Sequence, residues 1–183
     1  MTNKDKEYEY LRNEIVNCFS VIHKTIQMLY VSTTVVIAWA ISASNPLICL
    51  AAYGVIIPTY IISIDYNMGM LKIGAYLSVF YDDFKWEKRL HKINCMNIIN
   101  RHANSYRYPF SFCSIISFVI FFILFDYSNI ALNKIVQIIL NILFIIGFNL
   151  FVLFQHNNDK IKQLYIDKWC DIKLEEEKNI NAD

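Results

Sequence analysis

Residues 135 to 156 form an apolar run of helix length that carries no formal charge. About 20 such residues are long enough to cross the hydrocarbon core of a bilayer as a helix. The run nevertheless contains a set of polar side chains: Gln137, Asn141, Asn149, Gln155 and His156. At 100° per residue these gather on one side of the helix, and a lipid-facing surface has no use for them. This side, which we call the amide stripe, must therefore face protein or water.

The composition of the whole chain is that of a multipass membrane protein. Of its 183 residues, 56% are hydrophobic and 18% are charged, which is more apolar than an ordinary soluble domain. The net charge of +1 gives no reason to expect bulk attraction to nucleic acid. Five cysteines are scattered without a CxxC pair. We interpret them as small apolar residues and not as a disulfide framework.

The hydrophobic pattern predicts an all-α membrane protein with four transmembrane helices in two hairpins and with cytosolic amphipathic helices. Apolar residues that step by three and four from Tyr8 to Leu29 predict one long helix leading into the first span. Asn45 and Pro46 predict the first hairpin's turn, because a residue before proline is pushed out of helical geometry. The expected segments are a cytosolic helix over 1–27, a transmembrane hairpin over 28–64, a cytosolic helical insertion over 65–109, a second hairpin over 110–156, and a cytosolic C-terminal helix and tail over 157–183.

The basic residues predict the orientation of these segments. Sixteen of the seventeen Lys and Arg residues lie in the three segments expected to be cytosolic, and only Lys134 lies in a turn between paired spans. Cytoplasmic loops carry such an excess of basic residues. We therefore expect both termini and the central insertion on the cytoplasmic side, with membrane lipid around the spans.

The amide stripe permits two interpretations. In a ring of subunits it would line a water-filled path with weak charge selectivity. Inside a single bundle, the same residue types form hydrogen bonds between helices. The number of subunits decides between them, so both interpretations remain open at the level of sequence.

Other constellations give no catalytic or metal site. His91 and Cys95 lie at i and i+4 but are too few ligands, and His102 lies too far along a straight helix to join them. GxSxG, HExxH and glycine-rich phosphate loops are absent from the sequence. We therefore predict that the protein is not an enzyme and uses no metal or cofactor. The basic and aromatic run over 85–107 suits the membrane interface better than direct binding of nucleic acid.

Apolar seams on the cytosolic helices must pack on each other, on the helices expected over 70–100, or on another subunit. The seams over 8–29 and 161–172 expose more apolar surface than a lone helix tolerates. We expect a helical collar beneath the membrane, completed in a homo-oligomeric ring. The candidates for contact with a cytosolic partner are Trp86, Lys88, Arg89 and Trp169. The acidic run over 175–177 predicts a frayed end to the chain.

Two stretches of the chain are similar to a known family: EYEYLRNEI (Glu7 to Ile15) and YLSVFYDDFKWEKRL (Tyr76 to Leu90). With the layout of spans, they resemble small bacterial membrane proteins found with antiviral defence genes, in particular the membrane accessory protein of type VI-B CRISPR systems. That resemblance implies an inner-membrane oligomer whose central pore depolarises the cell after an RNA-guided, RNA-cleaving partner senses phage RNA. The family has also been linked to a ribonuclease motif in which His follows Arg after four to six residues. No arginine here has His at that spacing, so no catalytic residue is carried over.

Three functions are therefore in competition. The first is an oligomeric pore-like effector that perturbs membrane potential alongside an RNA-guided ribonuclease. The second is a non-conducting membrane scaffold or sensor whose insertion binds a cytosolic partner. The third is a small transporter, since both halves have the order span, span, cytosolic segment. The halves share no motif, however, and no charge lies at mid-membrane to couple to an ion, so we rank the transporter last.

Overall fold

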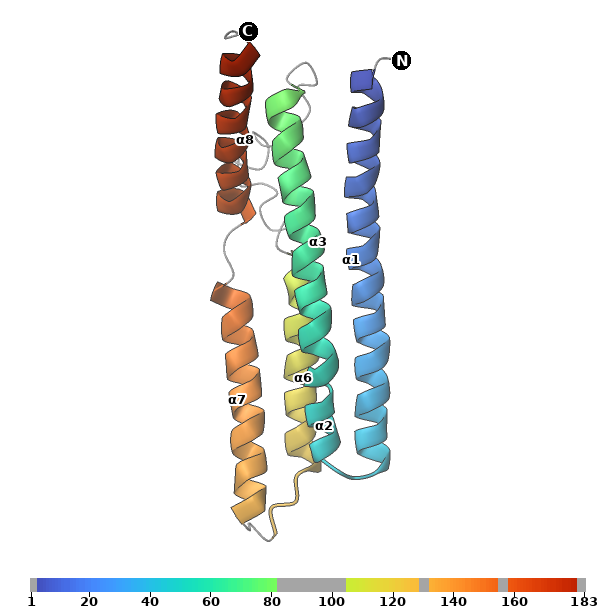
Figure 1. Cartoon of the computed structure of the whole chain (residues 1–183). Helices are drawn as coiled ribbons and strands as arrows, with labels where there is room; N and C mark the ends of the chain where they lie inside the picture. The colour runs from blue at the N-terminus through green and yellow to red at the C-terminus, as the bar shows by residue number, and fades with distance from the viewer. Residues whose placement is uncertain (1–2, 82–104, 129–131, 155–157, 181–183) are drawn as a thin grey trace. The chain divides into compact units, whose positions relative to one another are not determined.

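The computed structural model describes residues 3–81, 105–128, 132–154 and 158–180. These residues form helices joined by short turns, and none of those described lies in a strand. The predicted all-α class is confirmed for this part of the chain. Figure 1 colours the helices by their place in the chain, from blue for α1 to red for α8. Their bounds are α1 Asn3–Ser42, α2 Leu47–Ala51, α3 Tyr53–Phe80, the 3₁₀ turn η1 Ser105–Arg107, α6 Tyr108–Leu124, α7 Leu132–Phe154 and α8 Asn158–Ile180.

Three of the described helical stretches are long and apolar enough to cross a membrane. They are Asn3–Ser42, Leu47–Phe80 and Leu132–Phe154. Helix α6, with 17 residues, is apolar but shorter. By length and composition, these helices indicate a membrane location.

Helix α1 confirms the prediction of one long N-terminal helix. It runs for 40 residues from Asn3 to Ser42, a stretch without Gly or Pro. A backbone motif typical of helix C-termini follows. Ser44 adopts a φ of 48°, its N–H donates to the Ile41 carbonyl at 3.1 Å, and the Asn45 N–H donates to the Ala40 carbonyl at 3.1 Å. The Asn45 Oδ1 then accepts the Leu47 N–H at 3.0 Å, which leads the chain into α2.

Helix α3 carries the chain from the first predicted hairpin into the predicted insertion without a break. Only Ala52 separates α2 from α3, and its N–H donates to the Cys49 carbonyl at 3.2 Å. Helix α3 then continues through Pro58 to Phe80. The insertion's second predicted helix lies outside the described residues.

The chain divides into two compact units. Unit 1 holds residues 1–22, 64–104 and 156–183, and unit 2 holds residues 23–63 and 105–155. Helices α1 and α3 each contribute one part to each unit. Unit 2 gathers the residues of the two predicted hairpins, and unit 1 gathers those of the predicted cytosolic segments.

Unit 2 is packed largely through aromatic rings. Figure 1 shows α6 beside both α2 and α7. Near the α1–α2 turn, a buried cluster joins Ala40, Cys49, Phe121 and Phe125. Farther along α3, the fully buried Tyr60 has ring neighbours from two helices: Phe110 at 5.1 Å, Phe148 at 5.5 Å and Phe151 at 5.8 Å between ring centroids. Tilted and edge-on rings at these separations stabilise a core beyond the area they bury.

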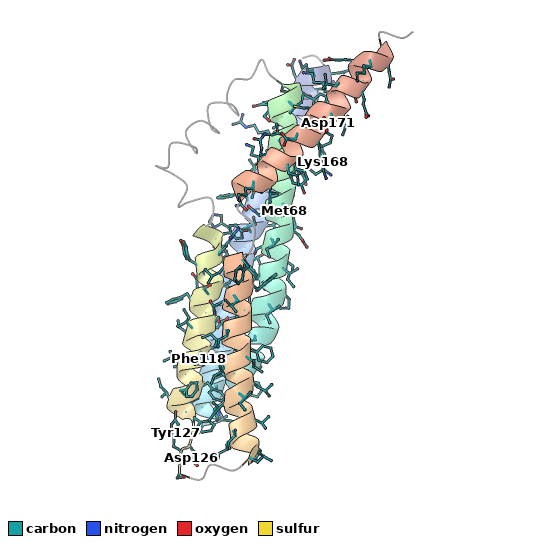
Figure 2. All side chains as sticks on the ribbon, turned by 90° about the vertical axis from the view of Figure 1, so that its left-hand side faces the viewer. Met68, Phe118, Asp126, Tyr127, Lys168 and Asp171 are labelled. Carbon is teal, nitrogen blue, oxygen red and sulfur yellow. The ribbon has the colours of Figure 1, made fainter. Side chains whose placement is uncertain are left out.

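Helix α8 corrects one prediction about unit 1. The acidic run over 175–177 lies within α8, which continues to Ile180, so the expectation of a frayed end was wrong there. Before the run, Lys173 anchors the helix. Its Nζ donates to the Val79 carbonyl at 3.2 Å, satisfying one of the carbonyls left open at the end of α3. Figure 2 labels two further α8 residues, Lys168 and Asp171.

A polar clip closes the turn between α6 and α7, beyond Phe118 of α6 in Figure 2. The Ser128 hydroxyl and N–H donate to Asp126 Oδ1 at 2.6 and 3.0 Å. The Lys134 Nζ donates to Asp126 Oδ2 at 3.0 Å, and Tyr127 donates to the Phe122 carbonyl at 3.2 Å. The Ser128 donors, together with Lys134, lower the pKa of Asp126 well below its ordinary value.

We expect Asp126→Asn to lower the thermal midpoint slightly at neutral pH. A depressed carboxyl pKa stabilises the folded state above the unfolded pKa, about 3.9, and this contribution is lost as pH falls through the folded pKa. The gap between wild type and variant should therefore narrow toward pH 3, and added salt should narrow it at neutral pH because the pair is exposed. Midpoints in detergent measure both effects. A gap that stayed constant with pH would contradict this role for Asp126.

Candidate functional site

The structure describes three residues of the amide stripe, all on α7. Asn141 is fully buried, and Gln137 and Asn149 are half-buried. Gln155 and His156 lie outside the described residues. The buried face of α7 consists of Asn141, Phe148 and Val152, so the stripe's centre faces the interior of unit 2.

Asn149 makes the kind of contact expected of an amide inside a helix bundle. Its Nδ2 donates to the Ser114 hydroxyl of α6 at 3.1 Å and to the Ile145 carbonyl of its own helix at 2.9 Å. The Ser114 carbonyl in turn accepts the Tyr53 hydroxyl of α3 at 3.3 Å. One polar node thus ties α3, α6 and α7 together. At Asn149 the observed geometry matches interhelical hydrogen bonding.

Asn141 differs from Asn149 in its surroundings. It is 0% exposed, yet neither its Oδ1 nor its Nδ2 has a hydrogen-bond partner among the described residues. Phe144, one turn along α7, stacks on Tyr53 with centroids 5.2 Å apart. Ile138, one turn before, packs against the cluster of Ala40, Cys49, Phe121 and Phe125. The amide therefore lies between two apolar layers.

Some polar positions of unit 2 were not predicted as site residues. Ser117 of α6 is 1% exposed, and its hydroxyl has no partner in the described part of the chain. The i, i+3 recurrence of Ser111, Ser114 and Ser117 does predict a close-packed face, but it gives no sign of which hydroxyl finds a partner. In the sequence, the hydroxyl of Tyr53 within an apolar run could have indicated the polar node that Tyr53 forms with Ser114 and Asn149.

Of the predicted partner-contact residues, only Trp169 is described. It is half-buried on α8 and packs edge-on against two α3 rings, Tyr76 at 5.1 Å and Phe80 at 6.2 Å between centroids. Its indole thus serves a contact within unit 1. Trp86, Lys88 and Arg89 lie outside the described residues.

A carboxylate and several rings join α1 to α3 in unit 1. The Tyr76 hydroxyl donates to Glu7 Oε1 at 2.8 Å, and Tyr76 also stacks on Phe80 at 4.7 Å. Tyr81 lies 5.7 Å from the Tyr8 ring. Burial and then the nearby Glu7 carboxylate raise the pKa of the Tyr81 phenol well above its ordinary value.

A second pair of contacts holds α8 against α3. The buried Asn67 donates through Nδ2 to Oδ1 of the buried Asn158 at 3.2 Å, and Lys173 donates to the Val79 carbonyl. Buried amides that bond each other avoid the cost of an unpaired polar group. Unit 1 is thus fixed at both ends of the α3–α8 contact.

No metal site was found in the part of the chain that the structure describes, where no three His, Cys, Asp or Glu residues gather suitably. His91, Cys95 and His102 lie outside that part. Comparison of the chain with protein-family models, with curated proteins and with solved structures gave no match.

Proposed function

We propose that this chain is an oligomeric, pore-like effector of the bacterial inner membrane. It enhances antiviral defence by perturbing the membrane potential, acting with an RNA-guided ribonuclease. Four helical segments cross the membrane as two hairpins, and α6, the third in chain order, is the shortest of them. Both termini and the segment over 65–109 lie in the cytoplasm. The distribution of basic residues supports this orientation, and the resemblance at 7–15 and 76–90 supports the defence role.

The polar interior of unit 2 carries the proposal. A helix bundle can sit in a membrane with an apolar interior alone, whereas buried polar side chains either hydrogen-bond between helices or line a path through the membrane. Asn141, Ser114 and Ser117 are nevertheless almost completely buried there. Helix α7 also leaves most of its apolar surface uncovered, since 17% of its apolar stretch is buried. That surface is available to lipid and to neighbouring copies in a ring.

One observation favours a second function, a non-conducting scaffold or sensor. Asn149 bonds Ser114 within the same chain, which is how amides act when they only hold a bundle together. The two functions differ in which substitutions they tolerate. A scaffold loses activity when Trp86→Ala alters the cytosolic face, and it keeps activity when amides of α7 become leucine.

A depolarisation assay tests the proposal. Cells express the protein with an RNA-guided ribonuclease, RNA cleavage is triggered, and a potential-sensitive dye is followed. We expect depolarisation with the wild type and its loss in the double variant Gln137→Leu/Asn141→Leu. The matched control is Ile139→Leu, a change at an exposed apolar position of the same helix. Equal signals from wild type and the double variant, or none from either, would rule out the pore mechanism.

A further inference from the structure

Asn141 is the most poorly accommodated polar side chain of unit 2. Both polar atoms of its amide are buried without a partner among the described residues, and the side chain is 0% exposed. An amide keeps its full desolvation cost when no hydrogen bond replaces the lost water, whereas an apolar side chain of similar size at the same place has no such cost. A buried unpaired group of this kind requires an explanation.

The residues one turn before and one turn after Asn141 on α7 make apolar contacts. On one side Ile138 packs against Phe121 and its cluster, and on the other Phe144 stacks on Tyr53. The Tyr53 hydroxyl already donates to the Ser114 carbonyl. The described arrangement therefore leaves the amide unsatisfied.

Helix α7 is the element best able to relieve this cost. Its buried face is narrow and consists of Asn141, Phe148 and Val152, while residues on its other sides, such as Leu143 and Leu153, are 61% and 75% exposed. Turning α7 about its axis would break the contacts of that face, chiefly those of the Phe144, Phe148 and Phe151 rings and the Asn149 bond to Ser114, while its exposed sides have few contacts to lose. Because Gln137 lies within 40° of Asn141 around the helix, the same turn would carry both amides.

We propose that the buried Asn141 amide favours a change in the conformation of α7. The unsatisfied amide raises the free energy of the described arrangement and favours a second one, in which α7 has turned and the Asn141 amide is hydrated. This inference deepens the proposed function: the described arrangement is the closed state, and hydration of Asn141 accompanies opening. Asn149 has the opposite effect, since its bonds to Ser114 and Ile145 hold the closed arrangement.

Thermal unfolding of purified protein in detergent gives the first test. We expect Asn141→Leu to raise the midpoint by about 4 °C, since it removes the unsatisfied amide and keeps the volume. Asn149→Leu, the matched change two turns along α7, should lower the midpoint because two hydrogen bonds are lost. An Asn141→Leu midpoint equal to or below that of the wild type would overturn the inference.

Cysteine labelling gives a second test that needs no trigger and no activity. Asn141→Cys and Phe121→Cys place thiols at two fully buried positions, one on α7 and one on α6, and the wild type corrects for native cysteines. A water-soluble maleimide should label position 141 several-fold faster than position 121. Equal rates would show general loosening and overturn the inference whatever the midpoints do. Failure of the proposed function differs, because it appears as absent depolarisation by the wild type.

Discussion

Replacing Trp169 by alanine is expected to destabilise unit 1 by about 3 kcal/mol, at the lower end of the range for removal of a packed tryptophan. The indole contacts Tyr76 and Phe80 of α3, so its loss leaves a cavity between α3 and α8. Hydrogen–deuterium exchange of α8 peptides should accelerate accordingly, and the thermal midpoint should fall.

The matched control for Trp169 is Leu174→Ala on the same helix. Leu174 is 55% exposed, and surface substitutions usually change stability by no more than about 0.5 kcal/mol. If Trp169 instead served mainly to bind a cytosolic partner, Trp169→Ala would leave α8 exchange at the wild-type rate and weaken only the partner's binding. That outcome would contradict the packing role argued from the ring contacts.

Tyr60→Ala is expected to destabilise unit 2 by about 2 kcal/mol. The ring is buried between Phe110 of α6 and Phe148 and Phe151 of α7, and its removal opens a cavity that three neighbours cannot all fill. The loss is smaller than for a water-soluble core, because packing and not transfer out of water holds helices together in lipid.

Ile61→Ala supplies the comparison for Tyr60. Ile61 is the next residue on α3 and is 46% exposed, so its truncation should leave the thermal midpoint in detergent within a degree or two of wild type. If Tyr60→Ala and Ile61→Ala lowered the thermal midpoint equally, the ring cluster around Tyr60 would not stabilise unit 2 more than an exposed side chain does.

Helix positions were largely predictable from the sequence because they depend on local patterns. The seam from Tyr8 to Leu29 steps by three and four without a break, and α1 follows it. Asn45 and Pro46 mark the turn, where Ser44 takes a positive φ. Each of these signals acts within a few residues of the structure it determines, so no knowledge of the folded neighbours is required.

Partners of the site residues were not predictable in the same way. The pattern of α7 shows that Asn141 and Asn149 share a side of the helix, but it cannot show that Ser114 satisfies one amide and that apolar layers surround the other. Glu7 and Tyr76 are 69 positions apart, and no periodicity relates them. The sequence left three possible contact surfaces for the seam of Trp169, and the structure shows that α3 covers it through Tyr76 and Phe80.

The contact between α3 and α8 determines where the chain tolerates change at its C-terminal side. Cutting the chain before α8 would remove the Asn158 amide from the buried Asn67 and the Lys173 ammonium from the Val79 carbonyl. Both α3 groups would then lose their bonds, and the aromatic face of Tyr76 would become uncovered. Helix α8 is therefore a structural part of unit 1. Affinity tags and fusion partners belong after Ile180, and shortened versions that stop before Asn158 would report on a damaged fold.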